Sequence, residues 1–429
     1  MKLTVNKVLL QRRDRAMGPA YRLFYKEPVH LVRGEGVWLY DADGEKFLDC
    51  YNNVASVGHC HPDVVDALHR QAATLNTHTR YLHENVVEYA ERLGATLPAG
   101  LDVCMFVCTG TEANDLAFRI ARTVTGHDGA IVMENAYHGN SMVVTELSTQ
   151  CYPAAWQPDY LEAVEAPNPY HGSWGEDEPD WGKKYAGRVG EAIDALAERG
   201  HGPAIFISDN IFSSNGILTP PLEYLQEAYK KVRAAGGLVI ADEVQSGFCR
   251  LGDHFWGFED SGVVPDIVTM GKPAGDGHPL AVVVTTAEIA AEFARRFDYF
   301  NTFGGNPVSA AVGLAVLEVI ERENILQNVR ETGELLGNGL RSLAQRHQWI
   351  GDVRGKGLFY GVELVRDRKT KEPAATEASR VRDFLRSNGI LLSTTGPLNN
   401  VIKIRPPMVF SKAHAGLLLD GLEQALVLL

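Results

Sequence analysis

Residues 238–245 read Leu238-Val239-Ile240-Ala241-Asp242-Glu243-Val244-Gln245, a short apolar run that ends directly in two carboxylates. A run of this length and composition is typical of a strand. An acid that terminates it would lie at the carboxyl end of the sheet, where open α/β sheets bind ligands. The alternative is an ordinary residue that caps the element following the strand. A buried carboxylate needs a positive partner, because isolated burial of a charge is costly.

Similar apolar runs alternate with helical stretches from about residue 60 to residue 300. The helical stretches include Glu112–Thr123 and Pro221–Ala235. The other strand candidates are Val103–Val107, Ala130–Met133, Ala204–Ile207, Ile267–Met270 and Ala281–Thr285. This alternation predicts an α/β fold with a mostly parallel sheet that helices cover on both faces.

The two ends of the chain follow a different pattern. Gly34–Gly44 predicts a hairpin-like pair of strands around an Asp-Gly turn. A long helix is expected from Asn306-Pro307 through about Arg322, and strands are expected in Val353–Leu364 and Val401–Ile404. We therefore expect a small α+β domain that is built from both termini.

Three parts of the chain follow from these patterns. Residues 1–60 form the amino-terminal segment of the small domain, and residues 61–305 form the large domain. Residues 306–429 form the rest of the small domain, with 306–325 as a linking helix. The segment Pro167–Trp181, rich in proline, glycine and acid, predicts a surface excursion of the large domain.

The composition is that of a globular protein, with 45% hydrophobic and 22% charged residues in 429. The formal charge of −13, with no basic tract, argues against nucleic acid and anionic membranes as partners. No apolar run approaches a membrane span, and the first residues lack the apolar core of a secretory signal. We expect a cytoplasmic protein. Six cysteines without a Cys-x-x-Cys pair argue against disulfides and a zinc site.

Two further signals stand at strand ends like that of Asp242. Cys108–Asn114 reads Cys-Thr-Gly-Thr-Glu-Ala-Asn and joins a strand to a helix, where free N–H groups and the helix dipole could bind a phosphate. A capping box of Thr109 or Thr111 with Glu112 is the alternative. Ile267–Pro273 ends in Gly271-Lys272-Pro273, and a surface lysine is the alternative there.

Together these signals match the needs of pyridoxal 5′-phosphate (PLP). That cofactor needs an anchored phosphate, a counter-ion for its ring nitrogen and an amine for a Schiff base. The phosphate cradle at Gly110 and Thr111, the acid Asp242 and the amine of Lys272 would supply the three in turn. We therefore predict a PLP enzyme with Lys272 as its catalytic lysine.

Over nearly its full length the chain resembles the class III aminotransferase family, of PLP fold type I. The resemblance implies a large domain with a mostly parallel, seven-stranded sheet between helices, and a homodimer or dimer of dimers. In that family the residues matching Gly110 and Thr111 bind the cofactor phosphate, and an aromatic residue matching Tyr137 stacks on the ring. Asp242 would pair with the ring nitrogen, Gln245 would lie near the 3′ oxygen, Lys272 would form the Schiff base, and Thr302 would reach the phosphate in the neighbouring subunit.

Other strings resemble the phospho-lyase branch of the family. They are Tyr51–Pro62, Leu75–His83 and Gly271–Pro279, together with Arg12–Arg15, Gly18-Pro19 and Arg22–Phe24. One position departs from the wider family, because Asp209 stands about where many members carry glutamate. No substrate role is assigned to that residue. The pair His59 and His61 is interpreted as structural, because two histidines in a loop are poor evidence for a metal site.

The resemblance implies that a small phosphorylated amine, such as O-phosphoethanolamine, loses phosphate and ammonia. A phosphate dianion requires several donors, preferably arginine. The candidates are Arg80, Lys403 and Arg405, with Tyr21 and Tyr25 as further possibilities. The alternative is an ω-aminotransferase in which Arg405 holds a substrate carboxylate. A PLP-binding structural protein is the third possibility, and the intact pair of Lys272 and Asp242 argues against it.

Overall fold

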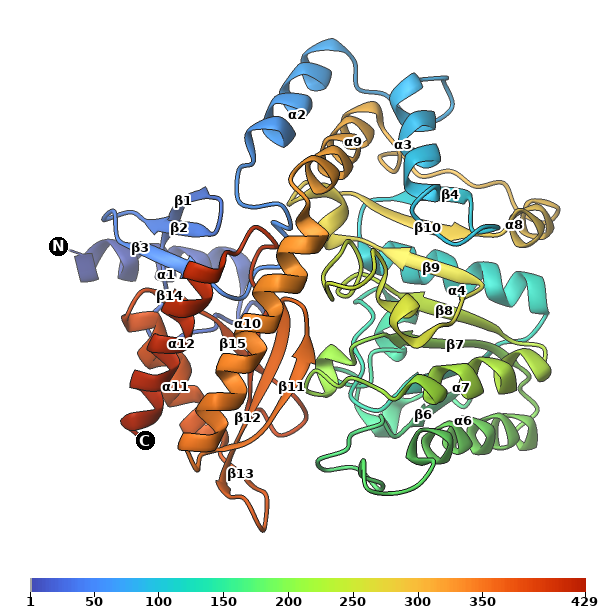
Figure 1. Ribbon diagram of the computed structural model, residues 1–429. Coiled ribbons are helices and arrows are strands. Elements are labelled where there is room, and N and C mark those ends of the chain that lie inside the picture. The colour runs from blue at the N-terminus through green and yellow to red at the C-terminus, as the bar shows by residue number, and fades with distance from the viewer. Residues whose placement is uncertain (1) are drawn as a thin grey trace.

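A seven-stranded sheet forms the centre of the larger part of the molecule in the computed structural model, which describes residues 2–429 (Figure 1). The sheet order is β4-β10-β9-β8-β7-β5-β6. The strands are β4 (Val103–Val107), β5 (Gly129–Met133), β6 (Leu161–Val164), β7 (Pro203–Asp209), β8 (Leu238–Asp242), β9 (Ile267–Met270) and β10 (Ala281–Thr285). Only β10 runs antiparallel to its neighbours, so the prediction of a mostly parallel sheet is confirmed.

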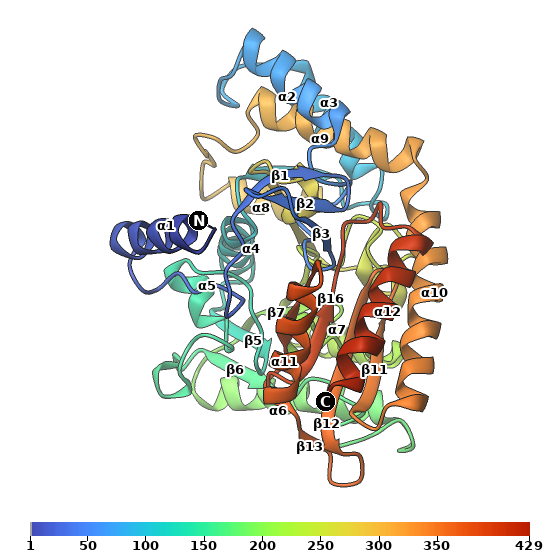
Figure 2. The same ribbon diagram turned by 90° about the vertical axis from the view of Figure 1, so that its left-hand side faces the viewer.

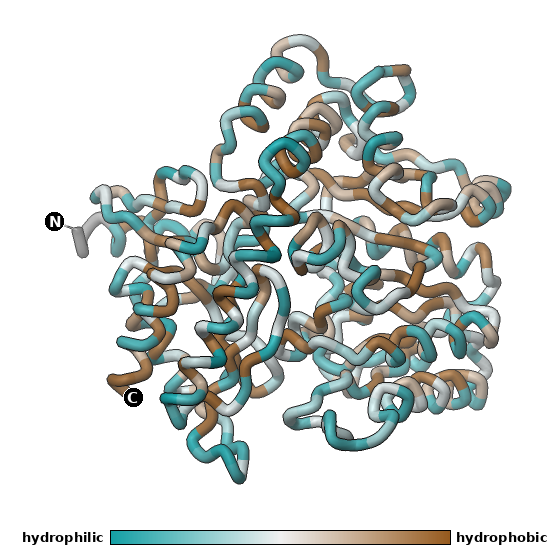
Figure 3. Tube along the Cα trace, viewed as in Figure 1, coloured by the Kyte–Doolittle hydropathy of each residue, from teal (hydrophilic) through white to brown (hydrophobic). Residues whose placement is uncertain are grey.

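Helices cover both faces of this sheet. The helices α4 (Gly110–Thr125) and α8 (Ala287–Ala294) pack on one face, and α6 (Trp181–Glu198) and α7 (Leu222–Ala234) pack on the other. Successive strand residues point to opposite faces, so Ile205 and Ile207 pack with α4, whereas Phe206 packs with α6 and α7. Hydrophobic residues accordingly follow the strands, and hydrophilic residues mark the outer loops (Figure 3).

The smaller part of the molecule joins the two ends of the chain. Its sheet has the order β11-β12-β16-β15, with β13 beside β12. These strands are β11 (Ile350–Lys356), β12 (Phe359–Asp367), β13 (Glu372–Pro373), β15 (Ser393–Thr395) and β16 (Val401–Ile404). A second sheet has the order β1-β2-β3-β14 and is made of β1 (Leu31–Glu35), β2 (Trp38–Asp41), β3 (Lys46–Asp49) and β14 (Ile390–Leu391). Because β14 pairs with β3, a carboxy-terminal strand completes an amino-terminal sheet (Figure 1). Figure 2 shows the strands β1, β2 and β3 of this sheet above β16.

The remaining α-helices of residues 2–429 complete the fold. They are α1 (Lys2–Met17), α2 (Pro62–Thr74), α3 (Glu84–Gly94), α5 (Met142–Glu146), α9 (Pro307–Arg322), α10 (Ile325–Arg346), α11 (Ala375–Ser387) and α12 (Lys412–Val427). The expected helix after Asn306 is therefore present as α9. Among residues 2–429, no helix is both long enough and apolar enough to cross a bilayer.

One expected strand is two strands in the structure. The interval Val353–Leu364 is divided between β11 and β12, which pair as an antiparallel hairpin. Gly357 lies between them with φ of 56°, a left-handed conformation that costs glycine little. The sequence analysis treated the whole interval as extended and missed this turn.

Candidate active site

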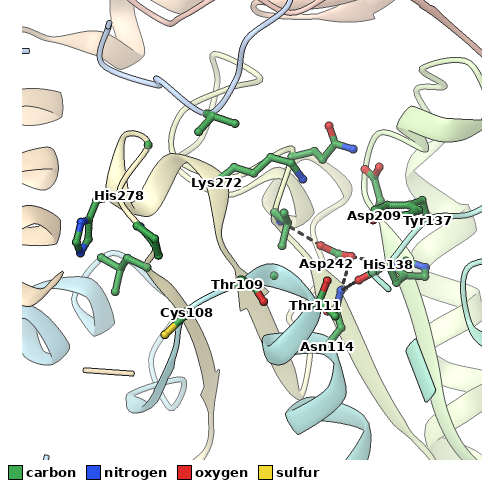
Figure 4. A pocket seen from close by; sticks show the side chains of 18 residues that line it. Cys108, Thr109, Thr111, Asn114, Tyr137, His138, Asp209, Asp242, Lys272 and His278 are labelled. Atoms are coloured by element: carbon green, nitrogen blue, oxygen red, sulfur yellow. Dashed lines mark hydrogen bonds and ion pairs between the residues drawn. The ribbon is translucent and has the colours of Figure 1, made fainter. Parts of the chain in front are cut away.

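A cavity of about 380 Å³ lies at the carboxyl ends of the central strands and at the start of α4. It brings together side chains from the ends of five strands, β4, β5, β7, β8 and β9, or from the loops that follow them (Figure 4). The lining residues that the sequence analysis proposed for the cofactor are Gly110, Thr111, Tyr137, Asp242, Gln245 and Lys272. The cavity therefore collects most of the predicted cofactor site.

Asp242 ends β8 and is 4% exposed. Its Oδ2 accepts hydrogen bonds from Asn114 Nδ2 at 2.9 Å and from His138 Nδ1 at 2.8 Å. Its Oδ1 accepts from the backbone N–H of Val244 at 3.1 Å. Thr269 donates to Asn114 Oδ1 at 2.6 Å and so fixes which way the amide faces. These donors fix the orientation of the carboxylate.

The start of α4 has the features of both sequence interpretations, a helix cap and a helix end that could bind a phosphate. Thr109 Oγ1 accepts from the N–H of Glu112 at 3.1 Å, and Glu112 Oε2 accepts from the N–H of Cys108 at 2.9 Å. The capping interaction is therefore present. The first N–H groups of a helix have no intrahelical partner, so those of Gly110 and Thr111 are available at the cavity wall. A Cβ on Gly110 would lie 2.9 Å from Val244 Cγ2, so a side chain there would disturb this wall.

Lys272 follows β9 and begins a short 3₁₀ turn, Lys272–Gly275. Burial lowers the pKa of its amine to about 8, and the positive charge of Arg405 adds to this shift. Asp242 and Asp209 act in the opposite direction. Figure 4 shows Lys272 on the side of the cavity that holds Asp242 and Asp209, with His278 across from it. The amine can therefore be neutral near neutral pH and act as a nucleophile or base.

Asp209 ends β7 directly beside Asp242, its partner in the strand register. Its Oδ2 accepts from the N–H and the hydroxyl of Ser213, at 3.0 and 2.5 Å. Gln245 donates to the same hydroxyl at 2.8 Å and accepts a hydrogen bond from Arg405. Asp209 thus fixes the position of a loop beside the cavity. This role requires no contact between its side chain and a substrate.

Lys403 and Arg405 lie behind the cavity rather than among its lining residues. They are two positions apart, so their side chains leave the extended chain of β16 on the same face. Lys403 is 7% exposed and Arg405 is 4% exposed. Burial lowers the pKa of Lys403 well below its ordinary value, and the charge of Arg405 lowers it further.

Two further predicted site residues also lie outside the lining of this cavity. Arg80 and Thr302 are both exposed. The guanidinium of Arg80 lies 4.1 Å from the ring centre of Phe300, so the segments around residues 80 and 302 share one surface. Of the further possibilities, Tyr21 is 60% exposed, and the hydroxyl of Tyr25 donates to the carbonyl of Leu392 at 2.8 Å.

Three residues that the sequence analysis did not assign take part in this site. They are Asn114, His138 and Ser213. A signal existed for His138, because it follows Tyr137 directly in Tyr137-His138-Gly139. Asn114 lies one helical turn after Gly110 and Thr111, on the same side of α4. No local pattern marks Ser213, whose partners are brought to it by the fold.

Comparison with known proteins shows the family of the chain. The family described as "Aminotransferase class-III" matches residues 24–426. The chain belongs to the class III aminotransferase family. It is an enzyme of that family, and its fold is that of the PLP fold type I transaminases.

The relatives include both lyases and aminotransferases. "Alanine–glyoxylate aminotransferase 2-like" of Drosophila melanogaster is 43% identical, over 97% of this chain and 86% of that protein. "Ethanolamine-phosphate phospho-lyase homolog 1" of Caenorhabditis elegans is 39% identical, over 98% and 93%. A solved phospholyase from Arthrobacter, in complex with phosphoethanolamine, is 43% identical with a TM-score of 0.95, covering 98% of this chain and all of that one. The resemblance to the phospho-lyase branch is therefore confirmed.

Proposed function

We propose that this enzyme binds PLP and eliminates phosphate and ammonia from a small phosphorylated amine such as O-phosphoethanolamine. The observation that carries the proposal is a pair of buried cations, Lys403 and Arg405, close enough to Lys272 for their charges to interact with its amine. The similarity to the Arthrobacter phospholyase supports the choice of substrate class.

The residues of the cavity fit PLP. The open N–H groups of Gly110 and Thr111 would hold its phosphate, and Asp242, buried and already oriented, would pair with the ring nitrogen. Tyr137 would cover the ring, and Gln245 would lie near its 3′ oxygen. His138 Nε2 is buried without a hydrogen-bond partner, so the polar wall is incomplete in the protein alone. Lys272 would supply the Schiff-base amine.

The buried cations fit a substrate with an anionic end. In the part of the chain that the structure describes, neither Lys403 nor Arg405 forms an ion pair with a carboxylate. Asp209, the acid that attracts both, already accepts three hydrogen bonds from its own loop. Buried charges are costly without a partner. A phosphate dianion from the substrate would compensate for both cations at once.

Lys272 would perform the proton transfer. When bound, the cofactor would supply the carbonyl that takes up the substrate amine and the ring that delocalises negative charge. With a pKa of about 8, about a tenth of the Lys272 amine is neutral at pH 7 and about half at pH 8, so it can take a proton from the carbon that carries the nitrogen. The same amine, once protonated, can return that proton.

The reaction is balanced by one water molecule. The C–H bond beside nitrogen breaks, the C–O bond to phosphate breaks at the next carbon, and phosphate leaves with the electron pair. Water then replaces nitrogen, so O-phosphoethanolamine and water give acetaldehyde, ammonia and inorganic phosphate. Lys403 and Arg405 would hold the leaving phosphate and stabilise its charge.

A class III aminotransferase reaction is the second candidate. It is favoured by the position of Arg405, which could hold a substrate carboxylate as readily as a phosphate. Lys272 would then move the proton without the loss of a leaving group from the substrate, and a keto acid or aldehyde would later accept the amino group. Both reactions use the same cofactor residues and differ in the substrate that the cations bind.

The proposal includes an assembly of two subunits or of two such pairs in the cytoplasm. Arg80 and Thr302 lie on one exposed surface of the chain and outside its own cavity. In a dimer joined through that surface they would contribute to the site of the neighbouring subunit. The small-molecule substrate would then bind between the two chains.

The test compares phosphate release by the parent enzyme and by Arg405→Ala. Losing an arginine–phosphate contact in a closed site costs about 2–5 kcal/mol, so release from O-phosphoethanolamine should fall by about ten-fold or more. Arg366→Ala is the control, because Arg366 pairs with Glu372 on the surface. A parent enzyme that releases no phosphate, but transfers amino groups from β-alanine to pyruvate, would replace the lyase by the aminotransferase.

A further inference from the structure

We infer that Asp49 and His59 are positioning residues for Arg405: together they hold the turn at Tyr51 that fixes its guanidinium. The inference rests on the proposed function, because it gives Arg405 the anionic end of the substrate. It assigns a task to His59, which the sequence pattern left as a structural residue. The inference is supported by hydrogen bonds that lead outward from Arg405.

Arg405 is held by the turn that follows β3. Its backbone N–H donates to the carbonyl of Cys50 at 2.8 Å, and its Nε donates to the carbonyl of Tyr51 at 3.2 Å. The guanidinium carbon lies 4.9 Å from the centre of the Tyr51 ring. A second guanidinium nitrogen donates to Gln245, at the cavity. The turn therefore sets where the guanidinium faces.

Asp49 determines the shape of this turn. It is the last residue of β3 and is 2% exposed. Its Oδ1 accepts from the N–H of Tyr51 at 3.0 Å and from that of Asn52 at 2.9 Å. An aspartate that binds the N–H groups two and three residues ahead stabilises a turn locally. Here that turn directs the carbonyl of Tyr51 toward Arg405.

His59 fixes the other oxygen of the same carboxylate. Its Nε2 lies 2.7 Å from Asp49 Oδ2. Its backbone exchanges two hydrogen bonds with Gly36, at 2.7 and 3.0 Å. A Cβ added to Gly34 would lie 2.8 Å from His59 Cβ, so β1 packs closely against this residue. Asp49 is thus held on one oxygen by the turn and on the other by an anchored histidine.

Two features connect this pair to substrate binding rather than to the cofactor. Neither residue lines the cavity, and no hydrogen bond joins them to the residues proposed for PLP in the part of the chain described. Asp49 also stabilises the buried charge of Arg405, whose pKa burial lowers. Without the pair, Arg405 would lose its fixed direction and keep its charge. The expected defect is weaker binding of an anionic substrate.

The test uses the two histidines of His59-Cys60-His61 as a matched pair in the holoenzyme. His59→Ala should raise KM for O-phosphoethanolamine by about five- to ten-fold, with kcat within about two-fold, because a charge-assisted contact is weakened and the reacting groups stay. Inhibition by inorganic phosphate should weaken by a similar factor. His59→Gln, which can still donate to Asp49, should restore most of both values.

His61→Ala is the control. His61 accepts the N–H of Asp63 and contacts Glu323 at 3.1 Å, so its loss affects the start of α2 and leaves Arg405 untouched. Its KM should equal that of the parent enzyme. Uptake of propylamine, which has no anionic end, is followed by cofactor absorbance and should not change in either variant.

The inference and the proposed function can fail separately. If the parent enzyme uses β-alanine and not O-phosphoethanolamine, the lyase proposal fails, and the same comparison is made with β-alanine, whose carboxylate needs Arg405 equally. If His59→Ala and His61→Ala have the same KM for the anionic substrate, the positioning role is wrong. The positioning role would also be contradicted if His59→Ala impaired propylamine uptake as much as it impaired binding of the anionic substrate.

Discussion

The amines of Lys272 and Lys403 are both buried near Arg405, and burial lowers the pKa of each below the ordinary value of lysine. For Lys272 the result is a pKa of about 8 in place of 10.5. In the cofactor-free protein, the rate at which Lys272 reacts with added PLP should therefore rise with the fraction of neutral amine. The rate should be half-maximal near pH 8. Stopped-flow absorbance measures this rate, and borohydride reduction with peptide mapping identifies the lysine. A midpoint near pH 10, or a label on another lysine, would contradict the assignment.

Lys403 should show a conflict between stability and function. Its folded pKa is depressed, so holding its charge in the buried site opposes folding at neutral pH. Replacing buried charges with apolar groups of similar size is neutral or stabilising, by about 1–4 kcal/mol. Lys403→Met should thus unfold at the same or a higher urea concentration than the parent enzyme, while KM for O-phosphoethanolamine rises. A clear loss of stability would mean that Lys403 has a structural partner.

At the scale of single residues, the sequence predicted those site residues that lie at the end of a strand or shortly after it. Lys272, Asp242 and Gly110 each follow a strand, so their common location could be predicted from the rule for open α/β sheets. Asn114 and His138 complete the Asp242 site from different elements, and Ser213 meets Gln245 only in the folded chain. Those contacts depend on side-chain directions across the sheet, which a single sequence does not specify.

At the scale of elements, strong periodic patterns gave correct strands and helices, and short or broken ones did not. The strands β4, β9 and β10 begin and end at their expected residues. The strand β6 reads Leu161-Glu162-Ala163-Val164 and was missed because a glutamate interrupts its apolar pattern. The β11–β12 turn was missed although Gly355-Lys356-Gly357 interrupts that interval. The proposed division of the chain at residues 60 and 305 stays a prediction.

A buried ionic network is formed by Glu363, His171 and Arg354. It predicts how the stability of the protein changes at acidic pH. Glu363 on β12 accepts from His171 at 2.5 Å and pairs with Arg354 at 2.6 Å, and Arg354 donates to the carbonyl of Gly216 at 2.9 Å. Burial alone would raise the pKa of Glu363, but the contacts with His171 and Arg354 outweigh it and lower the pKa to about 2 from 4.5. The ionised carboxylate is therefore favoured by folding. Its stabilisation is present above pH 4.5 and is lost as the pH falls toward 2.

Glu363→Gln should lower the free energy of unfolding at pH 7 by about 1–3 kcal/mol, because the buried Arg354 then keeps only Asp352 as an ion-pair partner. The difference from the parent enzyme should shrink as the pH falls from 4.5 toward 2. Urea unfolding at several pH values measures both effects. Glu372→Gln, in an exposed pair with Arg366, is the control and should change stability by less than about 1 kcal/mol. The network would be contradicted if the difference in unfolding free energy between Glu363→Gln and the parent enzyme did not change with pH.

At the scale of the whole molecule, the exposed positions of Arg80 and Thr302 predict sites shared between subunits. Lys272→Ala and Arg80→Ala are each expected to be nearly inactive alone. Mixed dimers would contain one site with both native residues if Arg80 acts across the interface, so random exchange should recover about a quarter of the parent activity. Sedimentation should detect a dimer under the same conditions. No recovery in confirmed mixed dimers would place Arg80 in its own subunit's site or remove it from the reaction.

The whole molecule also provides the test between the two candidate reactions, since both would use the same cavity and the same proposed cofactor residues. The most direct test counts products per active site when purified holoenzyme meets O-phosphoethanolamine without any keto acid or aldehyde. The account predicts many turnovers, with equal amounts of phosphate, ammonia and acetaldehyde. At most one turnover per site, with no phosphate released and the cofactor left in its amino form, would contradict elimination.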